Sequence, residues 1–152
     1  MDFCAGYINH DLLKFNQYSC QVKNCFLIKL IYGDQMNYFD HERLDVYQAA
    51  IEFVVLIDTV VENFPRGRAY LADQLQRAGA SVPLNIAEGA GEYSSNEKIR
   101  FYRMAKRSAT ECAGILDICQ RVQIIEERNY SKSRELLMRI VAMLTKMAKV
   151  SG

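Results

Sequence analysis

The sequence predicts an all-α fold, an antiparallel up-and-down four-helix bundle with left-handed packing. Apolar residues recur at alternating spacings of four and three in four segments after residue 40, which is the pattern of helices that bury one face. No segment alternates apolar and polar residues between hairpin turns, as a half-buried strand would. Short connections join the four segments, and this favours antiparallel packing of successive helices.

The first two predicted helices meet at a turn that contains proline and glycine. The first covers about residues 41–63, with Asp40 as its N-cap. Its apolar stripe consists of Leu44, Tyr47, Ile51, Val54 and Val61. The second covers about residues 68–90 and continues through Pro83. Because proline lacks an N–H group and crowds the carbonyl four residues back, we expect a kink at Pro83.

The last two predicted helices have the clearest periodicity. The third begins at Ser94 or Ser95, and the fourth covers about residues 131–149. The buried stripe of the third is expected to comprise Phe101, Ala105, Ser108, Cys112, Ile115, Cys119 and Val122. That of the fourth is expected to comprise Leu137, Ile140, Leu144 and Met147. Together with the first two helices, these stripes complete one shared core.

Composition excludes several kinds of site. The net charge of +1 means that nucleic-acid binding would need a local basic patch. Five cysteines without a CxxC pair argue against a disulfide framework and a zinc site, so we expect buried thiols in a reducing cytoplasm. There are two histidines and neither lies in a Glu-x-x-His, which excludes the di-iron centre usual in such bundles. The sequence therefore predicts neither a metal nor a cofactor.

The N-terminal region differs from the rest of the chain. The first 36 residues hold three lysines and no arginine, whereas the remainder holds eleven arginines and five lysines. We expect residues 1–36 to be an extension outside a bundle domain at residues 37–152, and we hypothesise that Met36 is the natural start. The alternative is a genuine extension that packs on the bundle or on a neighbouring subunit. Its longest apolar run, residues 25–32, is too short to span a bilayer, so no membrane association is expected.

Six polar residues fall on or beside the apolar stripes of the second and third helices. They are Gln74, Ser81, Asn85, Glu88, Ser108 and Glu111. We expect a hydrogen-bonded structural network, in which Asn85 or Ser81 binds backbone carbonyls freed by Pro83. The alternatives are a ligand-binding cluster and an enzyme that uses Glu88 and Glu111 as facing carboxylates. No nucleophile–base pair accompanies these residues, and we expect no enzyme activity.

A basic patch near the start of the third helix is the main functional feature. It comprises Lys98, Arg100, Arg103, Lys106 and Arg107, and Arg121 returns to the same outer face. At about 100° per residue, all but Lys98 project away from the buried stripe. Tyr102 lies among them and could stack on a base or on a guanidinium group. Secondary contacts are expected from Arg66, Arg68 and Arg77. The alternative is a solvated helix face balanced by neighbouring carboxylates.

The segment around Pro83 also resembles a known family. Residues Gln74, Leu75, Arg77, Ala78, Ser81, Val82, Pro83, Asn85, Ile86, Ala87, Glu88 and Gly89 match its pattern, followed by Phe101, Ala105, Ser108 and Glu111. Over roughly residues 39–150, the chain resembles four-helix bundle proteins encoded in intervening sequences of bacterial large-subunit rRNA genes, and the related accessory proteins of diversity-generating retroelements. The resemblance implies a ring-like homo-pentamer and association with a reverse transcriptase or another nucleic-acid enzyme.

These observations favour a non-catalytic homo-oligomeric scaffold that binds RNA or DNA. The first helix supports the oligomer because it is apolar nearly all round, and a single bundle buries only one stripe of such a helix. Arg100, Arg103, Lys106, Arg107 and Arg121 would neutralise phosphates without reading sequence. The alternative is a protein–protein interaction scaffold without nucleic-acid binding, whose arginines pair with acidic residues of neighbouring subunits.

Overall fold

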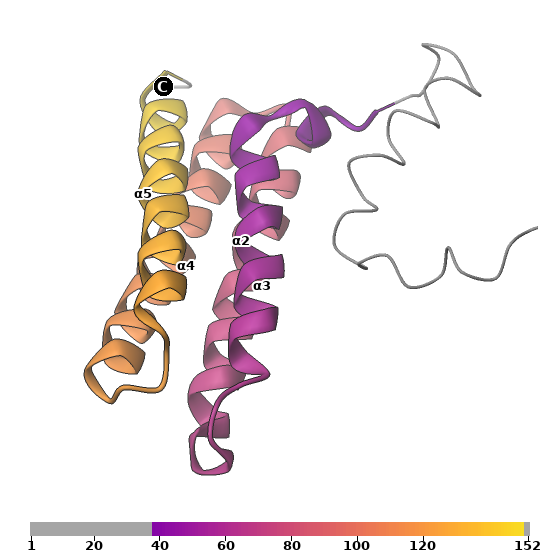
Figure 1. Cartoon of the computed structure of the whole chain (residues 1–152). Coiled ribbons are helices and arrows are strands. Elements are labelled where there is room, and N and C mark those ends of the chain that lie inside the picture. The colour runs from indigo at the N-terminus through magenta and orange to yellow at the C-terminus, as the bar shows by residue number, and fades with distance from the viewer. Residues whose placement is uncertain (1–37, 151–152) are drawn as a thin grey trace, which may run out of the picture. The chain divides into compact units, whose positions relative to one another are not determined.

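A computed structural model describes residues 38–150, which form four α-helices and two short 3-10 turns (Figure 1). The helices are α2 (Asp45–Val61), α3 (Ala69–Gly91), α4 (Ser95–Arg121) and α5 (Glu127–Val150). The turn η2 (Asp40–Arg43) precedes α2, and η3 (Arg66–Arg68) precedes α3. No strand occurs within residues 38–150. The predicted all-α four-helix bundle is confirmed, whereas the expectations for residues 1–36 lie outside the described part of the chain.

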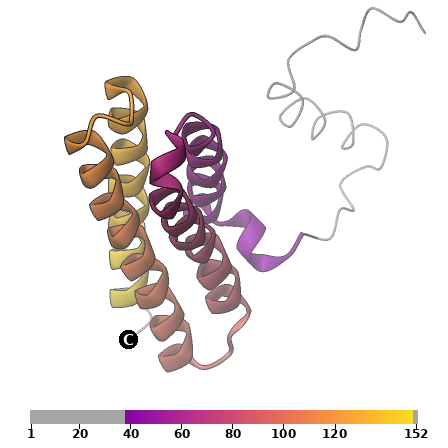
Figure 2. The same ribbon diagram turned by 90° about the horizontal axis from the view of Figure 1, so that it is seen from below.

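The helices follow one another up and down around a common core. α2 packs on α3, α3 on α4, α4 on α5, and α5 returns to pack on α2. Figures 1 and 2 show α2 beside α3 and α4 beside α5 in the same bundle. Because successive helices run in opposite directions, α3 ends and α4 begins at one end of the bundle, and α4 ends and α5 begins at the other.

The core contains much of the apolar stripes predicted for the third and fourth helices, although Phe101 and Ser108 are half-buried and Val122 is 38% exposed. Its largest fully buried apolar side chains come from all four helices: Phe53, Ile57, Leu75, Val82, Ile86, Leu116, Ile140 and Leu144. The stripe predicted for the first helix is wrong, because Leu44, Tyr47, Val54 and Val61 are only half-buried and Ile51 is 36% exposed. The buried residues of α2 are Val46, Ala49, Ala50, Phe53, Ile57 and Val60. At about 100° per residue, Ile51 points some 160° away from Phe53, and so it cannot share its face.

Two predicted helix starts are also wrong. Asp40 does not cap α2, because residues 40–43 form the separate turn η2, in which Glu42 accepts a hydrogen bond from the Phe39 N–H at 2.8 Å, and Leu44 holds the N-cap position. α5 begins at Glu127 rather than near residue 131. Its first turn is stabilised by the Glu127 carboxylate, which accepts hydrogen bonds from Ser131 and Gln120 at 3.0 Å.

Pro83 lies inside α3, which runs unbroken from Ala69 to Gly91. The kink at Pro83 stays a prediction. Gly79, whose carbonyl the proline ring crowds, also lies against the Ile57 side chain of α2. A Cβ added there would collide with the Ile57 side chain. Glycine at this position therefore allows both the internal proline and the close packing of α2 on α3.

Within residues 38–150, no helix has the length and apolar character needed to cross a membrane.

Candidate nucleic-acid interface

The outer face of α4 carries the predicted basic residues. Arg100, Arg103 and Arg107 are exposed, and Lys106 is half-buried because it lies toward the edge of this face. Lys98 is also half-buried. A hollow of about 500 Å³ is bordered by Arg103, Lys106, Arg107, Thr110 and Glu111. The structure thus brings three of the predicted cations to one place, beside a hydroxyl and one carboxylate.

These three cations are not neutralised within the described part of the chain. The two ion pairs found among residues 38–150 join Arg100 to Glu97 at 3.2 Å and Arg134 to Asp117 at 3.5 Å. Both side chains of the Arg100–Glu97 pair are largely exposed, so this pair contributes little to stability. Arg103, Lys106 and Arg107 therefore keep their charge available for an anion. We call them the α4 basic cluster.

Tyr102 does not belong to this surface, and the prediction that it stacks on a base is wrong. Its side chain is 4% exposed and packs against Gly89 of α3. Burial raises its pKa, because the phenolate would be poorly solvated there. The predicted stripe concealed this, because Tyr102 lies about 100° from the centre of that stripe at about 100° per residue. The face that is buried in the structure is rotated toward Tyr102 and includes Ala109 and Leu116.

The remaining predicted cations lie apart from the α4 basic cluster. Arg121 is exposed at the opposite end of α4, about 31 Å from Arg100 along the helix axis at 1.5 Å per residue. It borders a separate hollow of about 460 Å³ with Asp117, Tyr130 and Arg134. There the Tyr130 hydroxyl donates a hydrogen bond to Asp117 at 2.9 Å, and this bond raises the pKa of Tyr130.

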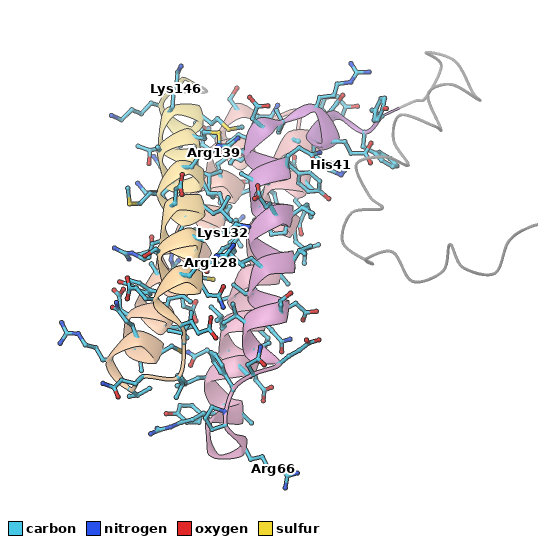
Figure 3. All side chains as sticks on the ribbon, viewed as in Figure 1. His41, Arg66, Arg128, Lys132, Arg139 and Lys146 are labelled. Carbon is cyan, nitrogen blue, oxygen red and sulfur yellow. The ribbon has the colours of Figure 1, made fainter. Side chains whose placement is uncertain are left out.

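Arg66 and Arg68 lie in the turn before α3, and Arg77 is the ninth residue of α3. The turn that holds Arg66 and Arg68 joins α2 to α3, so it lies at the end of the bundle opposite the start of α4 (Figure 3). Arg77 borders another hollow, together with Tyr70, Asp73 and Gln76. None of these three arginines borders the hollow at the α4 basic cluster.

Part of the predicted polar network forms between α3 and α4. Asn85 Nδ2 donates to the Ser81 carbonyl at 2.7 Å and to Ser81 Oγ at 3.0 Å, and Ser108 Oγ donates to Ser81 Oγ at 3.1 Å. Asn85 is 8% exposed, so these bonds are largely shielded from water. The carbonyl that Asn85 binds is that of Ser81. The carbonyl freed by the proline is that of Gly79, because Pro83 has no N–H to donate to it. Asn85 does not bind this carbonyl, so the predicted reason for this asparagine is wrong.

The other three predicted members stay outside the network. Gln74 and Glu88 are exposed on α3, and Glu111 is exposed on α4. Glu111 borders a hollow of about 170 Å³ above the network, together with Ser81, Asn85, Met104, Arg107 and Ser108. Glu88 does not border this hollow, so it holds no pair of facing carboxylates formed by Glu88 and Glu111.

The sequence interpretation missed a row of cations on α5. Arg128, Lys132, Arg139 and Lys146 are exposed and follow one another along the helix (Figure 3). Their spacings of four, seven and seven residues place them on one face, a signal that the sequence itself contains, and the exposed Glu135 shares that face. None of the four forms an ion pair with another described residue. We call them the α5 basic row.

The described residues offer no evident metal site. Within residues 38–150, no three His, Cys, Asp or Glu side chains are grouped as metal ligands would be. Cys112 and Cys119 are free, buried thiols. Burial, with a smaller effect of the negative charge on Glu111, raises the pKa of Cys112 from 9.0 to about 12. Such a thiol is a poor ligand and a poor nucleophile, because both roles need the thiolate.

The fold and this surface define a four-helix bundle protein with a basic outer face. The sequence pattern of one family, described as 23S rRNA-intervening sequence protein, matches residues 42–146, and the chain belongs to that family. Its fold is similar to a crystal structure of a protein of unknown function from the S23 ribosomal protein family of Bacteroides thetaiotaomicron VPI-5482. The two share 23% sequence identity and superpose with a TM-score of 0.64, over 68% of this chain and 98% of the other. No curated protein matches the chain.

Proposed function

We propose that this protein is a non-catalytic, homo-oligomeric scaffold that binds RNA or DNA through the α4 basic cluster. The observation that carries the proposal is the grouping of Arg103, Lys106 and Arg107 around one hollow, where Glu111 is the single carboxylate and forms no ion pair with any of them. Guanidinium groups match phosphate oxygens well because they offer two parallel N–H donors. Thr110 also borders this hollow, where its hydroxyl donates a hydrogen bond to the Lys106 carbonyl at 2.9 Å.

Charge elsewhere on the bundle is arranged consistently with this role. The α5 basic row extends over about 27 Å, from the 18 residues between Arg128 and Lys146 at 1.5 Å each. The net charge of the chain is only +1, so attraction of a polyanion depends on such local clusters. Contacts of this kind hold the backbone of a nucleic acid and carry no sequence information.

The description of the family supports a role with nucleic acid, although it names no ligand. It refers to intervening sequences of 23S rRNA. The resemblance to retroelement accessory proteins adds a reverse transcriptase or another nucleic-acid enzyme as the expected partner, in the cytoplasm. In this proposal the bundle holds the nucleic acid and the partner supplies the chemistry.

Exposed apolar side chains support assembly with further copies of the chain, and we propose a ring-like pentamer. The most exposed aliphatic and methionine side chains are Leu84 (61%) on α3, Ile118 (49%) on α4 and Met138 (66%) on α5. α2 contributes less than its composition suggests, because Ile51 (36%) and Val55 (39%) are its only exposed large apolar side chains. A ring would present several α4 basic clusters at once and so raise affinity without new contacts.

The competing function is a protein–protein interaction scaffold without nucleic-acid binding. An apolar hollow of about 290 Å³ between α4 and α5 favours it. Its lining comprises Ala109, Thr110, Ala113, Arg134, Leu137, Met138, Val141 and Ala142. In this alternative the basic residues pair with acidic residues of neighbouring subunits.

Fluorescence anisotropy with labelled mixed-sequence RNA and DNA separates the two functions. The test variant is Arg103→Glu/Arg107→Glu, and the matched control is Arg66→Glu/Arg68→Glu, which changes the charge equally at the other end of the bundle. We expect salt-sensitive binding by the wild type, with the slope of log Kd against log salt reduced by about two in the test variant. Light scattering checks that the oligomer is unchanged. An intact oligomer that binds neither RNA nor DNA would favour the protein–protein scaffold.

A further inference from the structure

Two hollows of different chemistry adjoin each other on α4. The smaller, of about 170 Å³, lies between α3 and α4 and has polar groups from both helices. The larger, of about 500 Å³, is bordered by the α4 basic cluster. Arg107 and Glu111 border both. The surface therefore places a recess with hydrogen-bonding groups directly beside a recess suited to an anion.

We propose that the paired hollows bind one unpaired nucleotide of a single strand, with its base in the smaller hollow and its phosphate at the α4 basic cluster. This inference rests on the proposed nucleic-acid binding and adds to it a class of ligand and a base-reading site. A base within a duplex cannot enter the smaller hollow, since its hydrogen-bonding edge is occupied and its faces are stacked.

The buried part of the smaller hollow is held in place before any ligand arrives. Asn85 uses its Nδ2 group in two hydrogen bonds to Ser81, which leaves its side-chain carbonyl without a partner among residues 38–150. Ser81 Oγ accepts hydrogen bonds from both Asn85 and Ser108, so its own proton remains free to donate. One acceptor and one donor are thus fixed at the base of the recess.

The outer part of the smaller hollow adds charged groups and an apolar wall. The Glu111 carboxylate accepts hydrogen bonds from amino groups, and the Arg107 guanidinium donates to ring nitrogens and carbonyls. Met104 is 38% exposed, and its thioether can lie against the face or edge of an aromatic ring. Together these groups match the edge and the face of a nucleobase.

Glu111 gives the site a preference that can be measured. It repels phosphate, so its presence weakens binding through charge alone. A base with an exocyclic amino group offsets this repulsion, because the amino group donates a hydrogen bond to the Glu111 carboxylate. Cytosine and uracil form a matched pair for this test, since cytosine carries an amino group where uracil carries a carbonyl oxygen. The proposal therefore expects oligocytidine to bind more tightly than oligouridine.

The experiment measures anisotropy with labelled ten-nucleotide oligocytidine and oligouridine, for the wild type, Glu111→Gln and Glu111→Ala. We expect the wild type to prefer oligocytidine by about tenfold, the effect of one hydrogen bond to a charged group. Both Glu111→Ala and Glu111→Gln should remove this preference, because alanine offers no hydrogen bond and the glutamine amide can accept from cytosine or donate to uracil. If Glu111 acts only by repelling phosphate, both variants should instead bind both oligomers more tightly, and by the same factor.

The experiment distinguishes base reading at the smaller hollow from nucleic-acid binding in general. Salt-sensitive binding with equal affinity for the two wild-type ligands overturns base reading and leaves the nucleic-acid scaffold in place. Absence of binding overturns both. Cytidine monophosphate provides a further comparison: if it binds as tightly as oligocytidine, the site takes free nucleotides and the assignment to a strand is wrong. Thermal unfolding and light scattering establish that the Glu111 variants keep fold and assembly.

Discussion

Gly89 on α3 lies so close to Tyr102 on α4 that a Cβ added at Gly89 would stand 2.8 Å from Tyr102 Cε1 and 3.1 Å from the Cβ of Phe101. This contact explains two features of the sequence at once. Glycine near the end of α3 allows the helices to approach, and the approach buries a tyrosine that would otherwise belong to the basic face of α4. The helix interface, and not the turn that follows α3, accounts for Gly89.

The first prediction concerns this contact. Gly89→Ala should lower the free energy of unfolding by about 1–2 kcal/mol, because the strain of overpacking this interface exceeds the stabilisation from the higher helix propensity of alanine. Urea unfolding followed by circular dichroism measures the change. Gly114→Ala is the matched control, since Gly114 is exposed in the middle of α4 and nothing lies within 4 Å of an added Cβ. It should raise stability by about 0.5–1 kcal/mol. Equal effects of the two substitutions would contradict the packing at Gly89.

The second prediction concerns Ser133 on α5. Its side chain is fully buried, and its hydroxyl has no hydrogen-bond partner within residues 38–150. A buried hydroxyl without a partner costs about 1–3 kcal/mol, so Ser133→Ala should stabilise the bundle by about 1 kcal/mol in urea unfolding. Ser131→Ala provides the comparison, because the exposed Ser131 donates to Glu127 at 3.0 Å and should not gain stability when truncated. Destabilisation by Ser133→Ala would show that the hydroxyl has a partner in solution.

The third prediction concerns the network between α3 and α4. Asn85→Ala removes two hydrogen bonds to Ser81 and leaves a space at a nearly buried position. We expect a loss of about 2 kcal/mol in the free energy of unfolding. Gln74→Ala, at an exposed position of the same helix, should change it by less than about 0.5 kcal/mol. Similar small effects of both substitutions would mean that the Asn85 network adds little to stability.

The bundle itself could be predicted from the sequence because its apolar periodicity is strong. Ile86, Cys112 and Leu144 each belong to an apolar repeat of helical spacing in their own helix, and all three are buried. The errors arose where periodicity alone decides poorly. Ile51 is apolar but points outward, and Tyr102 has a polar tip but packs inward. Which side of a helix faces a neighbour depends on how closely the helices approach, and Gly89 sets that distance for Tyr102.

The candidate site was only partly visible in the sequence. Helical geometry placed Arg103 and Arg107 together, because residues four apart share a face. The rise of about 1.5 Å per residue already separates Arg121 from them along the same helix. The position of Arg66 relative to them depends instead on how the helices pack. The α5 basic row was detectable in principle. It was missed because its four members are spread over 19 residues and do not form a dense run.

The fourth prediction concerns pH and Cys112. The pKa of its thiol is raised from 9.0 to about 12 in the folded protein, chiefly by burial. Above about pH 9 the unfolded chain releases this proton and the folded bundle keeps it, so the unfolded state binds fewer protons. Stability should therefore be complete below pH 9 and should fall as the pH rises from 9 toward 12. The slope that one such group contributes approaches about 1.4 kcal/mol per pH unit.

Urea unfolding of the wild type and of Cys112→Ala at pH 7.5, 9 and 10 isolates the contribution of this thiol. Alanine removes the ionisable group, so the variant should lose less stability between pH 9 and pH 10 than the wild type does. The comparison is necessary because burial also raises the pKa of Cys119 and Tyr102, and both add to the alkaline loss in either protein. Parallel pH profiles would mean that Cys112 ionises as readily in the folded protein as in the unfolded chain. The thiol would then be accessible to water, and the close packing of α4 in the core would be wrong at this position.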